Sequence, residues 1–122
     1  MVEHEKAWPE ELRVSADRKT LSVRFTDGRA YGLEAELLRV RSPSAEVQGH
    51  SPEQRVTVGG KSEVTITKVL PVGNYAVRLT FDDGHDTGIF TWKFLSETGA
   101  DKDARWAEYI AELADKGLSR TS

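Results

Sequence analysis

The sequence predicts an α+β fold: a mainly antiparallel sheet of hairpins, with short helices and an amphipathic C-terminal helix. In several segments, apolar side chains alternate with polar ones at a period of two, which is typical of half-buried strands. Short turns containing Asp-Gly or Gly-Gly join these segments, and such short turns connect antiparallel strands. Near the C-terminus the apolar spacing changes to that of a helix.

The length and composition restrict the possible classes of protein. The 122 residues suit one domain covering residues 1–122. The net charge of −3 lacks the basic excess of nucleic-acid-binding domains, so a nucleic-acid partner is not expected. The absence of cysteine excludes disulfides and thiolate metal sites, and it favours the cytoplasm. No apolar run approaches the roughly 20 residues that cross a bilayer, so no membrane association is expected.

Two segments of similar sequence each predict a hairpin followed by a short helix. They read VRFTDGRAYGLEAELL and VRLTFDDGHDTGIFTWKFL, and each has an Asp-Gly pair between its two strands. Asp-Gly allows the positive φ that tight hairpin turns need. We expect one supersecondary unit, used twice. The predicted strands are 21–26, 29–33, 75–82 and 86–90, and the predicted helices are 34–38 and 91–97.

Further strands are predicted at 12–15, 54–58 and 62–70, with Gly59-Gly60 as the hairpin turn between the last two. The sequence VGGKSE around that turn resembles the end of a phosphate-binding loop. However, Arg55 occupies the position where that motif requires its first glycine, and a strand follows where a helix is needed. Nucleotide hydrolysis is therefore not expected.

The C-terminal helix is predicted at about 101–116, ending at Gly117. An apolar stripe at i, i+3, i+4 and i+7 is formed by Trp106, Tyr109, Ile110 and Leu113. We expect this stripe to pack across one face of the sheet. The segment after the helix, 118–122, is expected to be mobile.

The segment RVRSPSAEVQGH, residues 39–50, combines two serines, a glutamate and a histidine. Serine hydrolysis needs an activated serine, but no G-x-S-x-G elbow surrounds any serine of this chain. Ser42 and Ser44 are therefore expected to form turn and capping hydrogen bonds. His50 is expected to be exposed to solvent.

The segment DDGHD gathers Asp82, Asp83, His85 and Asp86. Carboxylates and imidazole bind hard or borderline metal ions. Because Asp86 directly follows His85, the H-x-D/E spacing of many non-haem iron sites is absent. The alternative interpretation is a solvated hairpin tip, where acidic residues and glycine are common.

Together, LRVRSPSAEVQGH, GNYAVRLTFDDGHDTGIFTWKFL and the earlier WPEELRVSADRKTLSVRFTDG resemble the gamma-butyrobetaine hydroxylase-like N-terminal domain family. This family was formerly catalogued as a domain of unknown function. The resemblance extends from about residue 8 to 95. A C-terminal helix, here about 101–116, is a usual extension in stand-alone bacterial members.

The resemblance implies a metal site that has lost most of its ligands. In the hydroxylases, a C-x-C-x-x-C cluster and a later histidine bind structural zinc. The matching positions here are Ser42, Ser44, Val47 and His85. Hydroxyls are poor zinc ligands and valine is none, so the zinc site is expected to be absent. The family geometry would still place the 42–50 loop beside the 82–87 hairpin.

The resemblance also implies a function without catalysis, because the oxygenase domain of the hydroxylases is missing. We expect a non-enzymatic accessory or protein-interaction domain that uses a loop containing Pro43, Glu46 and His50. Related domains occur fused to iron–sulfur carrier ATPases, which suggests a role near metal or iron–sulfur cofactor handling and a protein partner. The alternative is an iron-binding protein that uses His85, Asp83 and Asp86.

Overall fold

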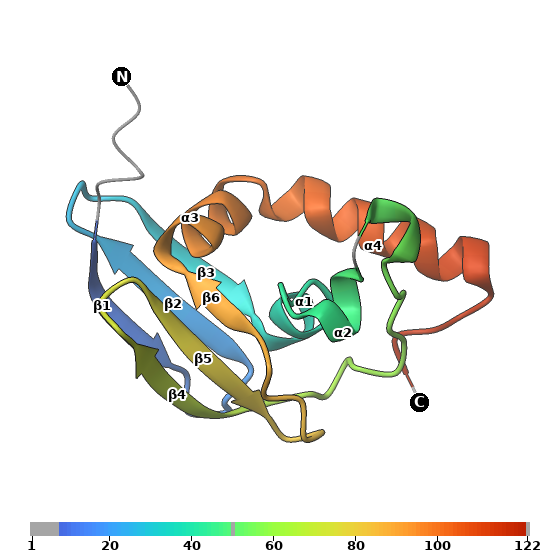
Figure 1. Ribbon diagram of the computed structural model, residues 1–122, viewed down its shortest axis with the longest axis horizontal. Helices are drawn as coiled ribbons and strands as arrows, with labels where there is room; N and C mark the ends of the chain where they lie inside the picture. The colour runs from blue at the N-terminus through green and yellow to red at the C-terminus, as the bar shows by residue number, and fades with distance from the viewer. Residues whose placement is uncertain (1–7, 50, 122) are drawn as a thin grey trace.

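A computed structural model describes residues 8–49 and 51–121, and its strands form two three-stranded antiparallel sheets (Figure 1). The first sheet has the order β1 (Pro9–Val14), β2 (Thr20–Phe25) and β3 (Ala30–Glu34). The second has the order β4 (Ile66–Val72), β5 (Ala76–Phe81) and β6 (Ile89–Thr91). The predicted α+β class is confirmed, although the strands divide between two sheets.

The helices are short except for the last. They are α1 (Ala35–Val40), α2 (Ala45–Gln48), the 3-10 turn η1 (Pro52–Gln54), α3 (Trp92–Ala100) and α4 (Lys102–Lys116). The Thr91 hydroxyl starts α3 by accepting a hydrogen bond from the amide of Phe94. Gly117, with φ of 67°, ends α4 in the left-handed conformation. None of the helices formed by residues 8–49 and 51–121 has the length and apolar character needed to cross a bilayer.

The predicted repeat is confirmed as two units, β2–β3–α1 and β5–β6–α3. Each hairpin turns at an Asp-Gly pair, and the glycines have nearly identical φ values, 93° at Gly28 and 92° at Gly84. This region of φ strongly favours glycine, so the two turns use the same backbone solution.

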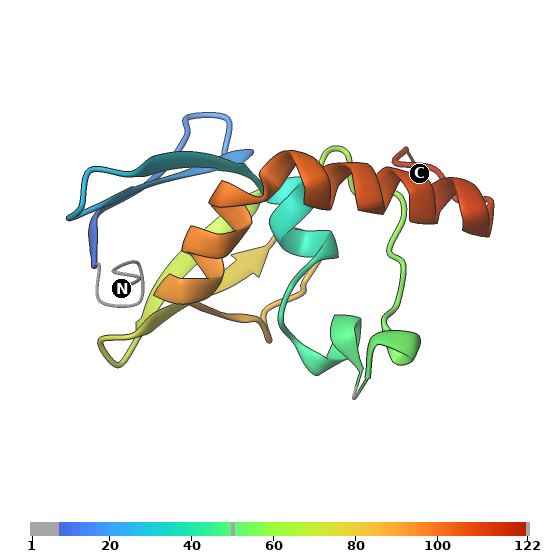
Figure 2. The ribbon, with the colours of Figure 1, turned by 90° about the horizontal axis from the view of Figure 1, so that it is seen from above.

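One apolar core lies between the two sheets and beneath helices α1 and α3. Side chains from both sheets and both helices are fully enclosed there, including Phe25, Leu38, Ile66, Leu79 and Leu95. This mixing of elements joins the two units into one body. Figure 2 shows α3 lying against the sheets.

Helix α4 does not cross a sheet face, so that prediction is wrong. Tyr109 and Leu113 pack instead against Val40 of α1 and Val58 in a second, smaller apolar cluster. Ile110 is 39% exposed and lies outside this cluster. Figure 2 shows α4 passing α1 and extending beyond the sheets.

The predicted strand 54–58 and the Gly59-Gly60 hairpin are also wrong. Residues 55–60 form no strand, and β4 begins only at Ile66. Groups from α4 and from the segment after it form hydrogen bonds with backbone groups that would otherwise pair with a neighbouring strand. The Tyr109 hydroxyl donates to the Val58 carbonyl at 2.6 Å, and the Gly60 amide donates to the Ser119 carbonyl at 2.8 Å.

The same contacts anchor the segment after α4, which was expected to be mobile. Its described part, 118–121, is fixed by Arg120, which forms two hydrogen bonds of 2.8 and 2.9 Å with Glu36 of α1. Gly59 lets these two segments of the chain approach closely, because a Cβ atom there would lie 2.9 Å from the Ser119 carbonyl oxygen.

Candidate functional site

Residues 42–49 of the loop and the 82–87 hairpin lie against each other, as the family resemblance implied. His85 Nε2 lies 3.0 Å from the Ser42 hydroxyl, and His85 Nδ1 lies 3.0 Å from the Glu46 carboxylate. The hydroxyls of Ser44 and Thr87 are 2.6 Å apart. Residues 43 positions apart in the chain are therefore joined by direct side-chain contacts.

The loop folds locally through its serines, as predicted. Ser44 is the N-cap of α2, and its hydroxyl accepts a hydrogen bond from the Glu46 amide at 3.1 Å. The Ser42 hydroxyl accepts from the Ser44 amide at 3.3 Å. Val47 is buried, and its carbonyl accepts from the Val56 amide at 2.7 Å. These bonds give the loop a defined backbone.

His85 is the centre of this arrangement, and only 6% of it is exposed. Burial, and then the nearby charge of Arg39, lower the pKa of His85 below its usual value, although Glu46 opposes this. The imidazole is therefore neutral at neutral pH. Because the Glu46 carboxylate can only accept, Nδ1 carries the proton and Nε2 accepts from Ser42.

The residues at the family's zinc-ligand positions do not fit zinc. Val47 presents only hydrocarbon, and the hydroxyls of Ser42 and Ser44 are engaged in hydrogen bonds. Both ring nitrogens of His85 also have partners. Hydrogen bonds therefore connect the two segments at the position where the family resemblance places a metal.

Two basic side chains of the same chain form ion pairs with the Asp83 carboxylate. Arg39 Nε and Lys61 Nζ lie 2.6 and 2.7 Å from its carboxylate, and the His85 amide donates to it at 3.0 Å. Partial burial would raise the pKa of Asp83, but these three donors lower it to about 2. This carboxylate is committed to the internal structure of the hairpin.

The other acidic residues of the hairpin do not converge on His85. Asp82 accepts a hydrogen bond from the Thr65 amide at 3.1 Å, and Asp86 is exposed. Within residues 8–49 and 51–121, no three histidine or acidic side chains are grouped so that they could hold a metal ion. His50, also predicted as part of the site, lies outside the described residues.

Ser42, His85 and Glu46 have the order of a catalytic triad: hydroxyl, imidazole, carboxylate. Ser42, however, has no exposed surface. Gly88 packs so closely that a Cβ atom there would lie 2.4 Å from the Ser42 hydroxyl oxygen. A nucleophile needs access to a substrate carbonyl, so this geometry favours a structural role for the three side chains.

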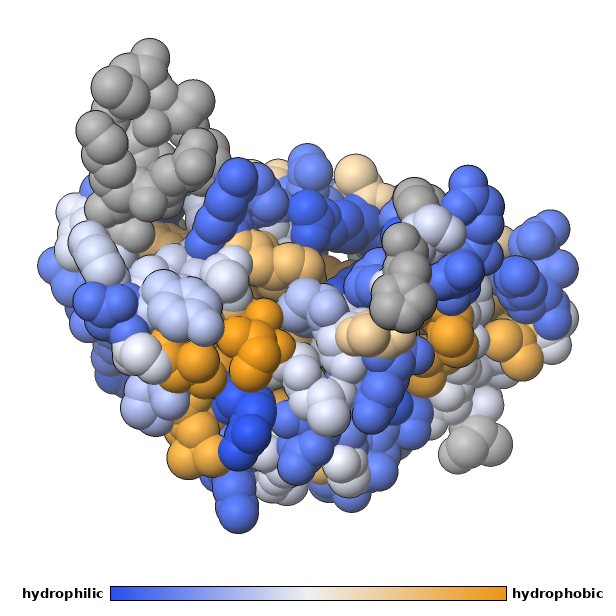
Figure 3. Space-filling view, in the orientation of Figure 1, coloured by the Kyte–Doolittle hydropathy of each residue, from blue (hydrophilic) through white to orange (hydrophobic). Residues whose placement is uncertain are grey.

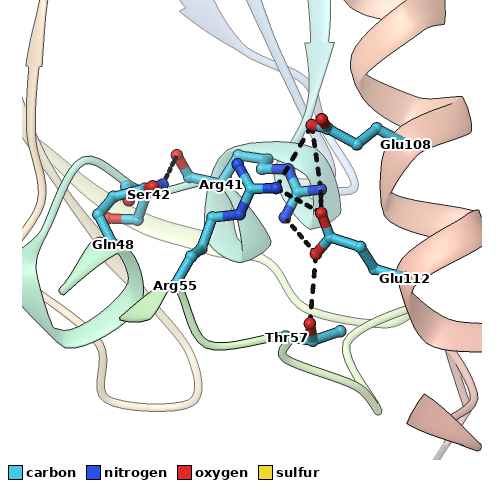
Figure 4. A network of polar contacts seen from close by, with 7 residues as sticks. All are labelled: Arg41, Ser42, Gln48, Arg55, Thr57, Glu108 and Glu112. Carbon is cyan, nitrogen blue, oxygen red and sulfur yellow. Dashed lines mark hydrogen bonds and ion pairs between the residues drawn. The ribbon is translucent and has the colours of Figure 1, made fainter. Parts of the chain in front are cut away.

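A second polar region, missed by the sequence interpretation, joins the loop to helix α4 (Figure 4). Glu112 accepts from Arg41 at 2.9 and 3.3 Å, from Thr57 at 3.2 Å, and from Arg55. Burial raises the pKa of Glu112, but Arg41 and Arg55 outweigh this and lower it. The ionised carboxylate of Glu112 therefore connects three segments of the chain: α4 itself, the residue after α1, and the segment before β4.

A cleft of about 380 Å³ opens beside this network, between α2 and the side of α3 and α4. Figure 3 shows the hollow below the hydrophilic side chains of α4. Its lining includes Arg41, Arg55 and Arg105, which are too distant in sequence to suggest a common site. The one signal was the i, i+4 spacing of Glu108 and Glu112, which places both carboxylates on one side of α4.

An apolar patch is exposed over the outer face of β4–β6 (Figure 3). Tyr75 is 52% exposed and Leu70 40%, and Arg78 is exposed beside Leu70 in the register of the sheet.

Comparison with known proteins gives a family and close structural relatives. The model of the family described as "Gamma-butyrobetaine hydroxylase-like, N-terminal" matches residues 12–96. No curated protein matches the chain. One protein solved by NMR in solution is 49% identical, with a TM-score of 0.79 over 93% of this chain and 90% of its own. Another NMR structure is 40% identical, with a TM-score of 0.82 over 98% and 89%.

A crystal structure is similar over a shorter range. It is that of a protein of unknown function from Acidithiobacillus ferrooxidans, assigned to the DUF971 family. It is 40% identical, with a TM-score of 0.62, and the match covers 75% of this chain and 92% of the other. With the family match over most of the chain, these relatives agree with the resemblance read from the loop and the hairpin. The chain belongs to the gamma-butyrobetaine hydroxylase-like N-terminal family.

Proposed function

We propose that this chain is a non-enzymatic accessory domain that binds another protein. Its binding surface is the rim formed by the 42–50 loop and the 82–87 hairpin. The observation that carries the proposal is the orientation of the polar groups. The groups capable of chemistry, Ser42 and His85, are buried and paired with each other. Around them, the exposed side chains include Glu46 on the loop and Asp82, Asp86 and Thr87 on the hairpin.

The exposed rim has the features of a recognition surface. Glu46 accepts a hydrogen bond from His85 Nδ1 through one carboxylate oxygen, yet the Glu46 side chain is 62% exposed. Asp86 and Thr87 are exposed at the adjacent hairpin. Because the hydrogen bonds beneath fix the backbone, little conformational entropy would be lost when a partner binds. A fixed loop carrying exposed polar groups suits binding better than it suits catalysis.

The family resemblance supports a partner among proteins that handle metal or iron–sulfur cofactors. Related domains fused to iron–sulfur carrier ATPases suggest this association. The cytoplasm is the proposed compartment, since a chain without cysteine does not depend on oxidising conditions. On this proposal the domain contributes binding and positioning, and the chemistry belongs to the partner.

The test begins with affinity capture of partners from native extract, using the full chain as bait. A captured protein is then purified and its Kd measured by calorimetry against wild type, Asp86→Arg and Asp115→Arg. Both variants reverse one exposed acidic charge, but Asp115 lies on the distant end of α4. We expect Asp86→Arg to weaken binding about ten-fold or more, and Asp115→Arg to leave it unchanged.

Two results would overturn the proposal. One is that no captured protein binds the purified chain. The other is that the Asp86→Arg and Asp115→Arg variants bind equally well.

A further inference from the structure

We infer that the arginine-lined cleft beside the 42–50 loop binds an acidic segment, rich in aspartate or glutamate, of the protein partner. This inference rests on the proposed function and specifies the chemistry of the partner. The cleft has a volume of about 380 Å³ and its walls include Pro43 and Gln48 of the loop. It is therefore continuous with the proposed binding surface.

The cleft is positive in a chain whose net charge is −3. Arg41, Arg55 and Arg105 line it, against the single lining carboxylate of Glu108. Glu108 and Glu112 both lie against Arg41 and Arg55 and compensate their charge. The guanidinium of Arg105 is the charge in excess, and it attracts carboxylates.

The three arginines have different tasks. Arg41 is 4% exposed, and its guanidinium holds Glu112 while lying 5.6 Å from the Tyr109 ring. It supports the floor of the cleft. Arg55 shares Glu112 from the partly exposed side. Their mutual carboxylate fixes both guanidinium groups before any ligand arrives.

Arg105 is the group most available to a ligand. Its guanidinium donates to the Thr98 hydroxyl at 2.8 Å and lies 5.8 Å from the Phe94 ring centre. Among the described residues it has no carboxylate within ion-pair distance, so most of its five N–H donors lack an internal acceptor. A planar guanidinium fixed on an aromatic ring is well placed for a two-point contact with a carboxylate.

The remaining lining suits a peptide better than a small inorganic anion. Gln48 uses its amide nitrogen to hold the carbonyls of Arg41 and Ser42, which leaves its side-chain oxygen as an acceptor. The Glu108 carboxylate is a second acceptor, and its side chain is 55% exposed. Pro43 and Phe94 add apolar surface. Peptide amide donors and apolar side chains would match these groups, whereas inorganic phosphate has neither amide donors nor apolar surface.

The inference is tested by selecting peptides from a phage-displayed library of random short sequences on the immobilised full chain. Parallel selections use Arg105→Glu and Arg78→Glu. Both variants make the same charge change, but Arg78 lies on the outer face of β5, beside the apolar patch. We expect aspartate and glutamate to be enriched on wild type and on Arg78→Glu, and the enrichment to vanish on Arg105→Glu.

A selected acidic peptide is then synthesised and its Kd measured by fluorescence anisotropy. We expect Arg105→Glu to weaken its binding about ten-fold or more, and Arg105→Lys to recover part of the loss. Melting curves confirm that each variant is folded. Competition with inorganic phosphate separates a peptide site from a general anion site, because equal binding of phosphate would overturn the inference.

The inference also fails if acidic residues are not enriched, or if Arg78→Glu and Arg105→Glu have equal effects. Its failure can be distinguished from that of the proposed function. A purified partner that loses affinity with Asp86→Arg but binds Arg105→Glu normally would leave the proposed function standing and exclude the cleft.

Discussion

The two Asp-Gly hairpins have the same backbone but place different side chains after the glycine. In the first, the Phe25 amide donates to the Arg29 carbonyl at 2.8 Å; in the second, the Phe81 amide donates to the His85 carbonyl at 2.9 Å. Arg29 lies 5.2 Å from the Phe25 ring centre, and the His85 ring lies 6.0 Å from that of Phe81. Arg29 and His85 are therefore equivalent positions of one repeated unit.

Each of these side chains also reaches a serine of the other unit. Arg29 Nη1 donates to the Ser96 hydroxyl of α3 at 2.5 Å, and His85 Nε2 lies 3.0 Å from Ser42, which follows α1. The first unit thus uses a permanent cation and the second a neutral, titratable ring. At equivalent positions, the first hairpin therefore contacts helix α3 through a cation, and the second contacts the loop after α1 through a neutral ring.

Replacing the aspartate of each turn should give the largest difference in unfolding free energy between the two hairpins. Asp83, whose side chain is 16% exposed, neutralises Arg39 and Lys61, so Asp83→Asn leaves two cations without their counter-charge. We expect a loss of about 2 kcal/mol in the free energy of unfolding, measured by urea titration. Asp27→Asn affects only Arg29, at a more exposed site, and should cost less. Equal losses would show that the two turns are held in the same way.

The turn glycines should instead behave alike. Gly28 and Gly84 have φ of 93° and 92°, and a Cβ atom at either position would meet nothing within 4 Å. Alanine at either position therefore pays only for backbone strain, about 1–2 kcal/mol in unfolding free energy. Clearly unequal losses in urea titrations of Gly28→Ala and Gly84→Ala would contradict the structural equivalence.

The pH dependence of stability should differ between the hairpins because only His85 titrates near neutrality. Burial lowers its pKa in the folded state, so below about pH 6.5 the unfolded chain binds the proton more readily. The contribution of neutral, buried His85 to the free energy of unfolding is complete above that pH. It is lost as the pH falls through the folded-state pKa of His85.

We expect the wild type to lose stability as the pH falls below about 6.5, and His85→Gln to lose less. Arg29→Gln, which alters the equivalent residue, should keep the wild-type slope. His4 and His50 are common to all three proteins, so the differences report on His85 alone. Parallel slopes for the wild type and His85→Gln would show that burial does not set its protonation.

Local patterns predicted the repeated units well. Alternation of apolar residues and the Asp-Gly turns are local signals, and the strands and helices they predicted are present within a few residues. The prediction that the 42–50 loop lies beside the 82–87 hairpin came from the family resemblance. It is confirmed by the contacts of His85 with Ser42 and Glu46.

Long-range contacts explain what the sequence did not reveal. Residues 54–58 have strand-like alternation, but Arg55, Thr57 and Val58 bind side chains of α4 instead of a neighbouring strand. The arginine-lined cleft was hidden for the same reason, because its cations come from separate segments of an acidic chain. No local pattern encodes such a meeting of distant residues.

We propose that hydrogen bonds, in place of a metal ion, connect the loop to the second hairpin. The ¹⁵N and ¹H NMR signals of the His85 ring, recorded at neutral pH with and without added Zn²⁺ or Fe²⁺, decide between the two. We predict a neutral ring protonated at Nδ1, with signals and melting temperature unchanged by either metal. A ring protonated at Nε2, or a stoichiometric metal-dependent shift with a raised melting temperature, would contradict the account.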